Sequence, residues 1–258
     1  MPMDLGIRGK VALVLGASKG MGRACAEALD QEGCLLAVCA RDAKPLEEHF
    51  PGADVLVRAC DVTRDADREA FVAAAVARFG RIDILVNNCG GPKPGAYGEA
   101  LSAKDWQDAF ERSLLQVVKW TDAVVPHMKG WGRIVNIVST TVKQPNDGLL
   151  LSNSIRPGVI GFSKSAAREL ARKGITINSI LPGLIRTDRA VELAEISAKR
   201  QGITLEAALD QKAEEIPAGR LGHPAEIGAT VAFLCSVPAA YITGTTILVD
   251  GGATRALH

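Results

Sequence analysis

The sequence has few of the residues that hold metal ions or cross-link small secreted domains. Its four histidines and six cysteines are scattered, no two histidines have metal-ligand spacing, and no Cys-x-x-Cys pair occurs. Most of the cysteines lie inside apolar segments, as Cys34 and Cys39 do, where they suit small buried side chains in a reducing compartment. We therefore expect neither a metal site nor a disulfide framework.

The chain also lacks a strong net charge and long hydrophobic runs. Its 30 Lys and Arg residues balance 29 Asp and Glu residues, so no basic surface for nucleic acid is implied. No apolar run has the length of a membrane span, and the first residues lack the basic and apolar regions of a secretory signal. We expect a cytoplasmic protein with neither a nucleic-acid nor a membrane partner.

What the chain does have is a regular alternation of short apolar runs and amphipathic stretches. With 258 residues, of which 47% are hydrophobic, one domain over residues 1–258 can bury a large core. The strand-length runs are Val11–Leu15, Leu35–Cys39, Val55–Ala59, Ile84–Val86, Ile134–Val138, Ile175–Ile180 and Thr246–Val249. The helical patterns between them include Met21–Gln31, Asp65–Phe79, Asp105–Met128 and Ile160–Lys173. The alternation predicts an α/β fold, a doubly wound parallel sheet of seven strands of the Rossmann type.

Residues 184–217 depart from this alternation. They have the pattern of charged helices, Arg189–Glu195 and Leu205–Glu215, between the last two strands. Ligands of open α/β sheets bind beyond the carboxyl ends of the strands, where an insertion leaving the strand at Ile180 would lie. We expect this segment to be a substrate lid, the alternative being a surface excursion without a role.

A glycine-rich turn follows the first predicted strand and precedes a helix. It runs Gly16-Ala-Ser-Lys-Gly20-Met-Gly22. Glycine permits a tight turn and a close approach of backbone to pyrophosphate, and the helix N-terminus adds free N–H groups. The context predicts a dinucleotide site, although the spacing is G-x-x-x-G-x-G and not G-x-G-x-x-G.

That spacing resembles the short-chain dehydrogenase/reductase family, and further motifs follow in the family's order. They are Asp61-Val62, Asn87-Asn-Cys-Gly90, Ile134-Val-Asn-Ile-Val-Ser139, Asn178-Ser-Ile-Leu-Pro-Gly183, and the segment from Tyr241 to Gly252. The segments Leu151–Arg156 and Asn87–Gly95 resemble a divergent branch that is similar to β-ketoacyl carrier-protein reductases. The resemblance implies an oxidoreductase that reduces a carbonyl or oxidises an alcohol by hydride transfer with a nicotinamide cofactor.

The resemblance also assigns the cofactor contacts. They are Gly16, Ser18, Lys19, Gly20, Met21, Gly22, Arg41, Asp61, Val62, Asn88, Gly90, Arg156, Pro182, Gly183, Ile185 and Thr187. The second strand ends at Ala40, where an acid would hold the ribose 2′-hydroxyl of NAD, and Arg41 follows. Lys19 and Arg41 can accept the 2′-phosphate of NADP, so NADP is favoured, while Asp42 keeps NAD open.

The catalytic positions depart from the family pattern. Ser139 matches the family's serine, but Ser152 stands where the family has tyrosine, Arg156 where it has lysine, and Ser113 where it has asparagine. An aliphatic hydroxyl is a far weaker acid than a phenol, and arginine does not release its proton usefully. Arg156 can still bind ribose hydroxyls and stabilise a developing alkoxide.

Several groups could replace the missing proton donor. Tyr97 in the Gly90–Gly98 loop could face the pocket or pack on the lid, and a water held by Ser139, Ser152 and Arg156 could relay the proton. The loop residues Lys143, Asn146 and Asp147 could also line the pocket, whereas Cys89 suits a small filler better than a nucleophile.

Three functions remain open on the sequence. The first is an NADP-dependent carbonyl reductase or alcohol dehydrogenase with a substitute donor, acting on a small molecule. The second is a non-catalytic NADP-binding sensor or partner subunit, and the third is a dehydratase or epimerase that keeps the cofactor. The resemblance further implies a homo-oligomer, a tetramer or a dimer, which suits the apolar stretches Leu114–Val125 and Ile160–Leu170.

Overall fold

A seven-stranded, fully parallel sheet forms the centre of the computed structural model, which describes residues 3–257. The strand order is β3-β2-β1-β4-β5-β6-β7. The strands are β1 (Val11–Val14), β2 (Leu35–Ala40), β3 (Val55–Ala59), β4 (Ile84–Asn88), β5 (Gly132–Ile137), β6 (Ile175–Pro182) and β7 (Thr246–Val249). The chain reverses its direction of winding between β1 and β4, which opens a crevice at their carboxyl ends. The predicted doubly wound Rossmann fold is confirmed.

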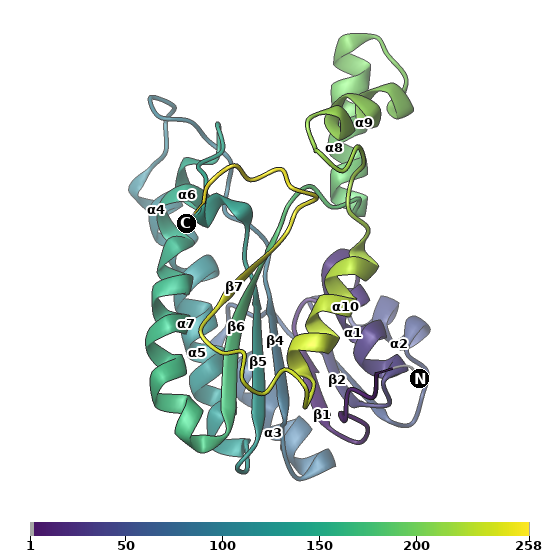
Figure 1. Ribbon diagram of the computed structural model, residues 1–258, viewed down its shortest axis with the longest axis vertical. Coiled ribbons are helices and arrows are strands. Elements are labelled where there is room, and N and C mark those ends of the chain that lie inside the picture. The colour runs from purple at the N-terminus through teal and green to yellow at the C-terminus, as the bar shows by residue number, and fades with distance from the viewer. Residues whose placement is uncertain (1–2, 258) are drawn as a thin grey trace.

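Helices cover both faces of this sheet (Figure 1). One face carries α1 (Gly20–Gln31), α2 (Lys44–His49) and α10 (Pro224–Cys235), and the other carries α3 (Asp65–Phe79), α5 (Gln116–Val124) and α7 (Pro157–Leu170). Two short helices, α4 (Ala103–Phe110) and α6 (Leu150–Ile155), lie near the carboxyl ends of the strands (Figure 1).

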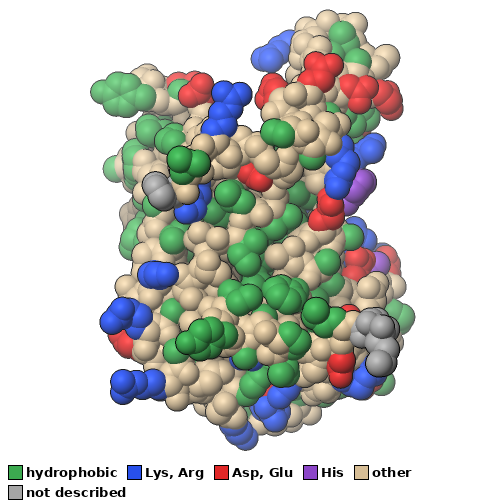
Figure 2. Space-filling model, viewed as in Figure 1, with side chains coloured by type: hydrophobic (Ala, Val, Ile, Leu, Met, Phe, Trp, Pro, Cys, Tyr) green, Lys and Arg blue, Asp and Glu red, His purple; other side chains and the backbone are tan. Residues whose placement is uncertain are grey.

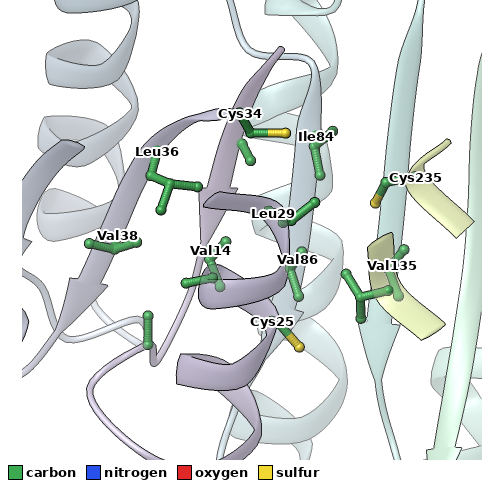
Figure 3. Packing of buried hydrophobic residues seen from close by; sticks show 14 of the residues in the cluster. Val14, Cys25, Leu29, Cys34, Leu36, Val38, Ile84, Val86, Val135 and Cys235 are labelled. Atoms are coloured by element: carbon green, nitrogen blue, oxygen red, sulfur yellow. The ribbon is translucent and has the colours of Figure 1, made fainter. Parts of the chain in front are cut away.

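The strands alternate their side chains between two hydrophobic clusters. In β1, Ala12 and Val14 point to the cluster beneath α1 and α10, and Leu13 points to the cluster beneath α3, α5 and α7. Figure 3 shows Cys25 and Leu29 of α1 packed over the strands. Because both faces of the central strands are buried, most of their residues are apolar, which is why short hydrophobic runs marked them in the sequence.

The predicted helix Asp105–Met128 is wrong in its start and its continuity. The helix begins earlier, at Ala103, because the Ser102 hydroxyl accepts a hydrogen bond from the Asp105 N–H at 3.2 Å and the Asp105 carboxylate accepts from the Ser102 N–H at 2.9 Å. A π-helix (Glu111–Leu115) separates α4 from α5, and a 3₁₀ turn containing Pro126 follows Val124. Hydrophobic periodicity does not distinguish a single π turn from the α-helix around it.

The inserted segment forms two helices, α8 (Asp188–Gln201) and α9 (Leu205–Glu214). Ala194 of α8 and Leu209 of α9 share a small hydrophobic cluster with Leu221, which follows α9 in the chain. Figure 1 shows both standing beyond the carboxyl ends of the strands, with the C-terminal tail crossing toward α6.

Two features are absent from residues 3–257. None of the helices in this range is both long and apolar enough for a membrane crossing. Nor does this range bring three or more His, Cys, Asp or Glu side chains together in a way that could hold a metal ion.

Candidate active site and cofactor pocket

The glycine-rich turn takes the conformation that its glycines were expected to permit. Gly16 and Gly20 have φ angles of 61° and 59°, which L side chains rarely adopt. A Cβ on Gly22 would lie 2.2 Å from the Gly16 carbonyl oxygen, so this position holds α1 against the end of β1. Asn88 at the end of β4 donates from Nδ2 to the carbonyl oxygens of Leu15 and Gly16, both at 3.2 Å. The neighbouring strand therefore fixes the shape of the turn.

A pocket of about 330 Å³ opens beside this turn, at the carboxyl ends of β1 to β4. Of the predicted cofactor residues it is lined by Gly16, Ser18, Lys19, Arg41, Asp61, Val62, Asn88 and Gly90. A second pocket, of about 340 Å³, is lined by Lys19, Gly20, Met21, Asn88, Gly90, Arg156 and Thr187. The two pockets adjoin because they share Lys19 and residues 88–90. We call the first the adenosine pocket and the second the reaction pocket, after the parts of the cofactor that the family resemblance predicts for them.

The adenosine pocket has the charges that a polyanion requires. Within residues 3–257, Lys19 and Arg41 pair with no carboxylate, and both side chains are exposed. The pKa of Asp61 is lowered, first by hydrogen bonds from the Thr63 hydroxyl and N–H and further by the charges of Arg112 and Arg41. The pocket therefore presents unpaired cations for phosphates and one carboxylate that can accept from an amine. These residues fit a phosphorylated adenine dinucleotide.

Four predicted cofactor residues lie outside the walls of both pockets. One is Gly22 at the start of α1, and the other three, Pro182, Gly183 and Ile185, lie where the chain leaves β6. Pro182 ends β6, and Gly183 donates its N–H to the Val249 carbonyl at 3.0 Å. Ile185 is buried beside Gly222, where the chain leaves the sheet toward α8. In this structure Pro182, Gly183 and Ile185 shape the path by which the chain leaves β6, next to the reaction pocket.

Arg156 reaches from the junction of α6 and α7 to the end of β5. Its guanidinium donates to the carbonyl oxygen of Val138, and it lines the wall of the reaction pocket beside Cys89 and Gly91. Burial lowers the pKa of Arg156, and the adjacent Cys89 opposes that shift. Arginine remains charged despite such a shift, so a partly buried positive charge lies at the reaction pocket.

Ser139 and Ser152 are joined through Thr141. The Ser139 hydroxyl accepts from the Thr141 N–H at 3.2 Å, and the hydroxyls of Thr141 and Ser152 are 3.1 Å apart. Ser139 is half-buried at the end of β5, whereas Ser152 is 6% exposed. The Ser152 hydroxyl is thus directed at Thr141, and neither Ser139 nor Ser152 belongs to the wall of either pocket.

Ser113 lies in the π-helix and faces a small cavity. This cavity, of about 10 Å³, is walled by Asn87, Cys89, Gly90, Ser113, Val117, Ile137, Val138, Arg156 and Val159. Its size suits one water molecule. The Ser113 hydroxyl is buried and has no hydrogen-bond partner among residues 3–257. Ser113 and Arg156, predicted together as catalytic positions, therefore meet across this space.

The two tyrosines do not act as substitutes in this structure. Tyr97 is 94% exposed, so the expectation that it faces the pocket or packs on the lid is wrong. Tyr241 is also fully exposed and packs into no core. Desolvation raises the pKa of the Cys89 thiol to about 12, although Arg156 lowers it, which agrees with a filler and not with a nucleophile.

Sequence reasoning missed several residues that line the pockets. Arg112 and Gln116 enter the adenosine pocket from the π-helix and the start of α5. Gln116 donates to the Cys89 sulfur. Asp188 and Arg189 at the start of α8 line the reaction pocket. Arg112 and Gln116 are four residues apart, and this helical spacing was the only signal in the sequence that both could face the same pocket.

This fold and site define an oxidoreductase-type dinucleotide-binding protein. The family model described as Enoyl-(Acyl carrier protein) reductase matches residues 16–254. The chain therefore belongs to the short-chain dehydrogenase/reductase family.

Several of its relatives and structural neighbours are reductases by name. The chain is 38% identical over 252 residues to the 3-oxoacyl-(acyl-carrier-protein) reductase FabG of Vibrio cholerae serotype O1, covering 96% of this chain and 98% of that one. It is 38% identical over 252 residues to a putative ketoacyl reductase of Streptomyces coelicolor, covering 94% and 96%.

Among solved structures, L-sorbose reductase from Gluconobacter frateurii, complexed with NADPH and L-sorbose, has a TM-score of 0.92. It is 34% identical, and the match covers 99% of this chain and 100% of that chain. An actinorhodin polyketide ketoreductase with NADPH has a TM-score of 0.88 at 36% identity, with coverage of 99% and 100%.

Proposed function

We propose that this protein is an NADP(H)-dependent reductase that converts a small-molecule ketone to an alcohol, or the reverse, without the usual phenolic proton donor. The observation that carries the proposal is the pair of adjoining pockets. One presents the unpaired cations Lys19 and Arg41 beside the glycine-rich turn, and the other ends at Arg156. Relatives named as ketoacyl reductases and neighbours complexed with NADPH support the same reaction and cofactor.

The nicotinamide would supply the hydride, and the protein's own residues would bind and orient the carbonyl. Ser139 can donate its hydroxyl proton in a hydrogen bond to the carbonyl oxygen, since that hydroxyl accepts from Thr141 and keeps its own hydrogen free. The partly buried charge of Arg156 would stabilise negative charge that develops on this oxygen. Both roles are electrostatic and require no proton release from arginine.

Neither Ser152 nor Tyr97 is placed to donate the proton that the reduction requires. Ser152 is an aliphatic alcohol held against Thr141, and Tyr97 is exposed to solvent. We infer that the proton reaches the alkoxide from water and that turnover is slower by a factor of about 10²–10⁴ than with a positioned acid. Such a site best suits a ketone whose own substituents stabilise the alkoxide that forms on reduction.

The deciding experiment measures cofactor binding and turnover separately. Titration calorimetry with NADP⁺ and NAD⁺ is expected to give tighter binding of NADP⁺, and Arg41→Ala is expected to weaken NADP⁺ about 10-fold or more while leaving NAD⁺ nearly unchanged. NADPH consumption is then followed with 3-oxoacyl thioesters, ketoses and simple ketones. Failure of the wild-type protein to bind either dinucleotide would refute the proposal.

A second function, an NADP-binding sensor or partner subunit, is favoured by one observation. Ser152 and the Arg156 guanidinium are both engaged in hydrogen bonds within the protein, and neither Ser139 nor Ser152 lines the wall of the reaction pocket. Tight NADP⁺ binding without turnover of any ketone or alcohol would support this function over the reductase.

We also propose that residues 184–217, which contain α8 and α9, form a substrate lid. Leu193 and Ile196 are exposed on α8, whose first residues line the reaction pocket, so a bound substrate could draw this apolar face inward.

We further propose that the chain assembles into a homo-oligomer. Figure 2 shows hydrophobic side chains gathered on the middle of the face that carries β7 and α10 in Figure 1. Phe233, Val237 and Leu248 are exposed in these elements or next to them, which supports association there. A monomer by light scattering would refute the oligomer.

A further inference from the structure

Arg112 is a cation in the adenosine pocket that the sequence motifs did not assign. It projects from the π-helix, whereas Arg41 follows β2 and Asp61 follows β3, so three separate elements meet around one space. The Arg112 side chain is exposed and has no ion pair with any residue between positions 3 and 257. Its guanidinium is therefore available to a ligand.

We propose that Arg112 binds the adenine base of the cofactor by stacking its guanidinium plane on the ring. This inference rests on the proposed dinucleotide binding and adds a contact to it. A planar guanidinium offers both a flat face and a positive charge to an aromatic ring, which lysine does not.

The surroundings of Arg112 favour a base over a phosphate. Asp61 lies close enough for Arg112 to influence its carboxylate, ahead of Arg41. A carboxylate repels a phosphate but accepts a hydrogen bond from an amino group, as adenine provides. Ala40 and Val62 add apolar wall to the same pocket. A phosphate is better placed near Lys19 and Arg41, on the side of the glycine-rich turn.

The position of Arg112 also depends on the π-helix. The extra residue in that turn changes which side chains of the segment face the sheet, so that Ser113 is buried against the small cavity while Arg112 and Gln116 reach the adenosine pocket. One turn of helix thus carries Arg112 at the adenosine pocket and Ser113 at the small cavity beside Arg156.

The test compares the binding of three probes to the full-length protein by titration calorimetry. NADP⁺ and NAD⁺ contain adenine, and nicotinamide mononucleotide does not. Arg112→Ala is expected to raise the Kd of NADP⁺ and of NAD⁺ by the same factor, about 5- to 30-fold, and to leave the Kd of the mononucleotide unchanged. Arg112→Lys, which keeps the charge without the planar face, is expected to stay nearer to the alanine variant.

Lys104→Ala provides the matched control. Lys104 lies on α4, pairs with Asp108 at 3.0 Å and is not part of the pocket wall, so this variant removes one positive charge nearby without touching the ligand. It is expected to bind all probes as the wild type does. Because Arg112 is exposed, its variants are expected to keep the wild-type circular dichroism spectrum and Tm.

The outcomes separate this inference from the proposed function. Equal Kd values for wild type and Arg112→Ala would overturn the contact while leaving dinucleotide binding intact. A loss confined to NADP⁺ would overturn the base assignment, because it would place Arg112 on the 2′-phosphate. A wild-type protein that binds neither dinucleotide would overturn both.

Discussion

The guanidinium of Arg156 donates to the carbonyl oxygen of Val138, the residue directly before Ser139. This bond ties the junction of α6 and α7 to the end of β5, so the positive charge and the serine hydroxyl are positioned by the same stretch of backbone. A change at either residue is therefore expected to affect the other.

Ser139→Ala is expected to lower kcat by about 10²-fold, the cost of losing one donor to a developing oxyanion, and to leave the Kd of NADP⁺ within a factor of about 2. Steady-state kinetics and calorimetry on the same preparation measure both quantities. Thr140→Ala, one residue further along the same turn, serves as the control and is expected to keep wild-type kcat. An unchanged kcat in the Ser139 variant would remove this residue from the mechanism.

The combination of Ser152→Tyr and Arg156→Lys is expected to raise kcat by about 10²–10⁴, because a phenol beside a cation can donate a proton near neutral pH. The control replaces Ser152 by Phe together with Arg156→Lys, which adds the same bulk without a hydroxyl. Equal rates for the two double variants would show that the donor is not what limits turnover. Thermal unfolding confirms that both proteins are folded, since Ser152 is buried against Thr141.

Gly22→Ala is expected to abolish dinucleotide binding and to reduce the free energy of unfolding by about 1–3 kcal/mol, because its Cβ would meet the Gly16 carbonyl oxygen. Gly52→Ala is the matched control, since an added Cβ there meets no described atom within 4 Å. Urea unfolding and NADP⁺ titration measure the two effects. Wild-type binding by the Gly22 variant would mean that the turn tolerates displacement of α1.

Acid is expected to weaken the start of α10 through Glu226. Its carboxylate accepts from Arg220 and from the His223 N–H, which lowers its pKa from the ordinary 4.5 to about 2. A group with a lowered folded-state pKa stabilises the protein above its unfolded pKa, and this stabilisation is lost as the pH falls from 4.5 toward about 2. The stability difference between wild type and Glu226→Gln should therefore shrink over that range. A difference that stays constant with pH would contradict this account.

The sequence predicted the sheet well because burial on both faces leaves a direct hydrophobic pattern. Val11–Val14 illustrates this, since all four residues are apolar and buried. The glycine-rich turn could be predicted because its backbone admits few side chains, as at Gly22. Arg41 and Asp61 in the adenosine pocket followed from the family resemblance.

Contacts between side chains that are far apart in the sequence were harder to predict. The bond between Thr141 and Ser152 joins residues eleven positions apart, and nothing in the local pattern distinguishes it from a serine that faces a substrate. The exposure of Tyr97 likewise depends on how the loop after β4 lies over the rest of the fold. The π turn that brings Arg112 to the adenosine pocket differs from an α-helix by one residue per turn, a difference without a compositional mark.

The bonds from Asn88 to the Leu15 and Gly16 carbonyls have a consequence for the thermodynamics of binding. They hold the glycine-rich turn in one shape through the neighbouring strand, so the conformational entropy of its flexible residues is already lost when the chain folds. A ligand that enters the pocket therefore loses less entropy in ordering the protein. Calorimetry of dinucleotide binding should accordingly show a smaller entropic penalty than in an Asn88→Ala variant, whose turn is free to move.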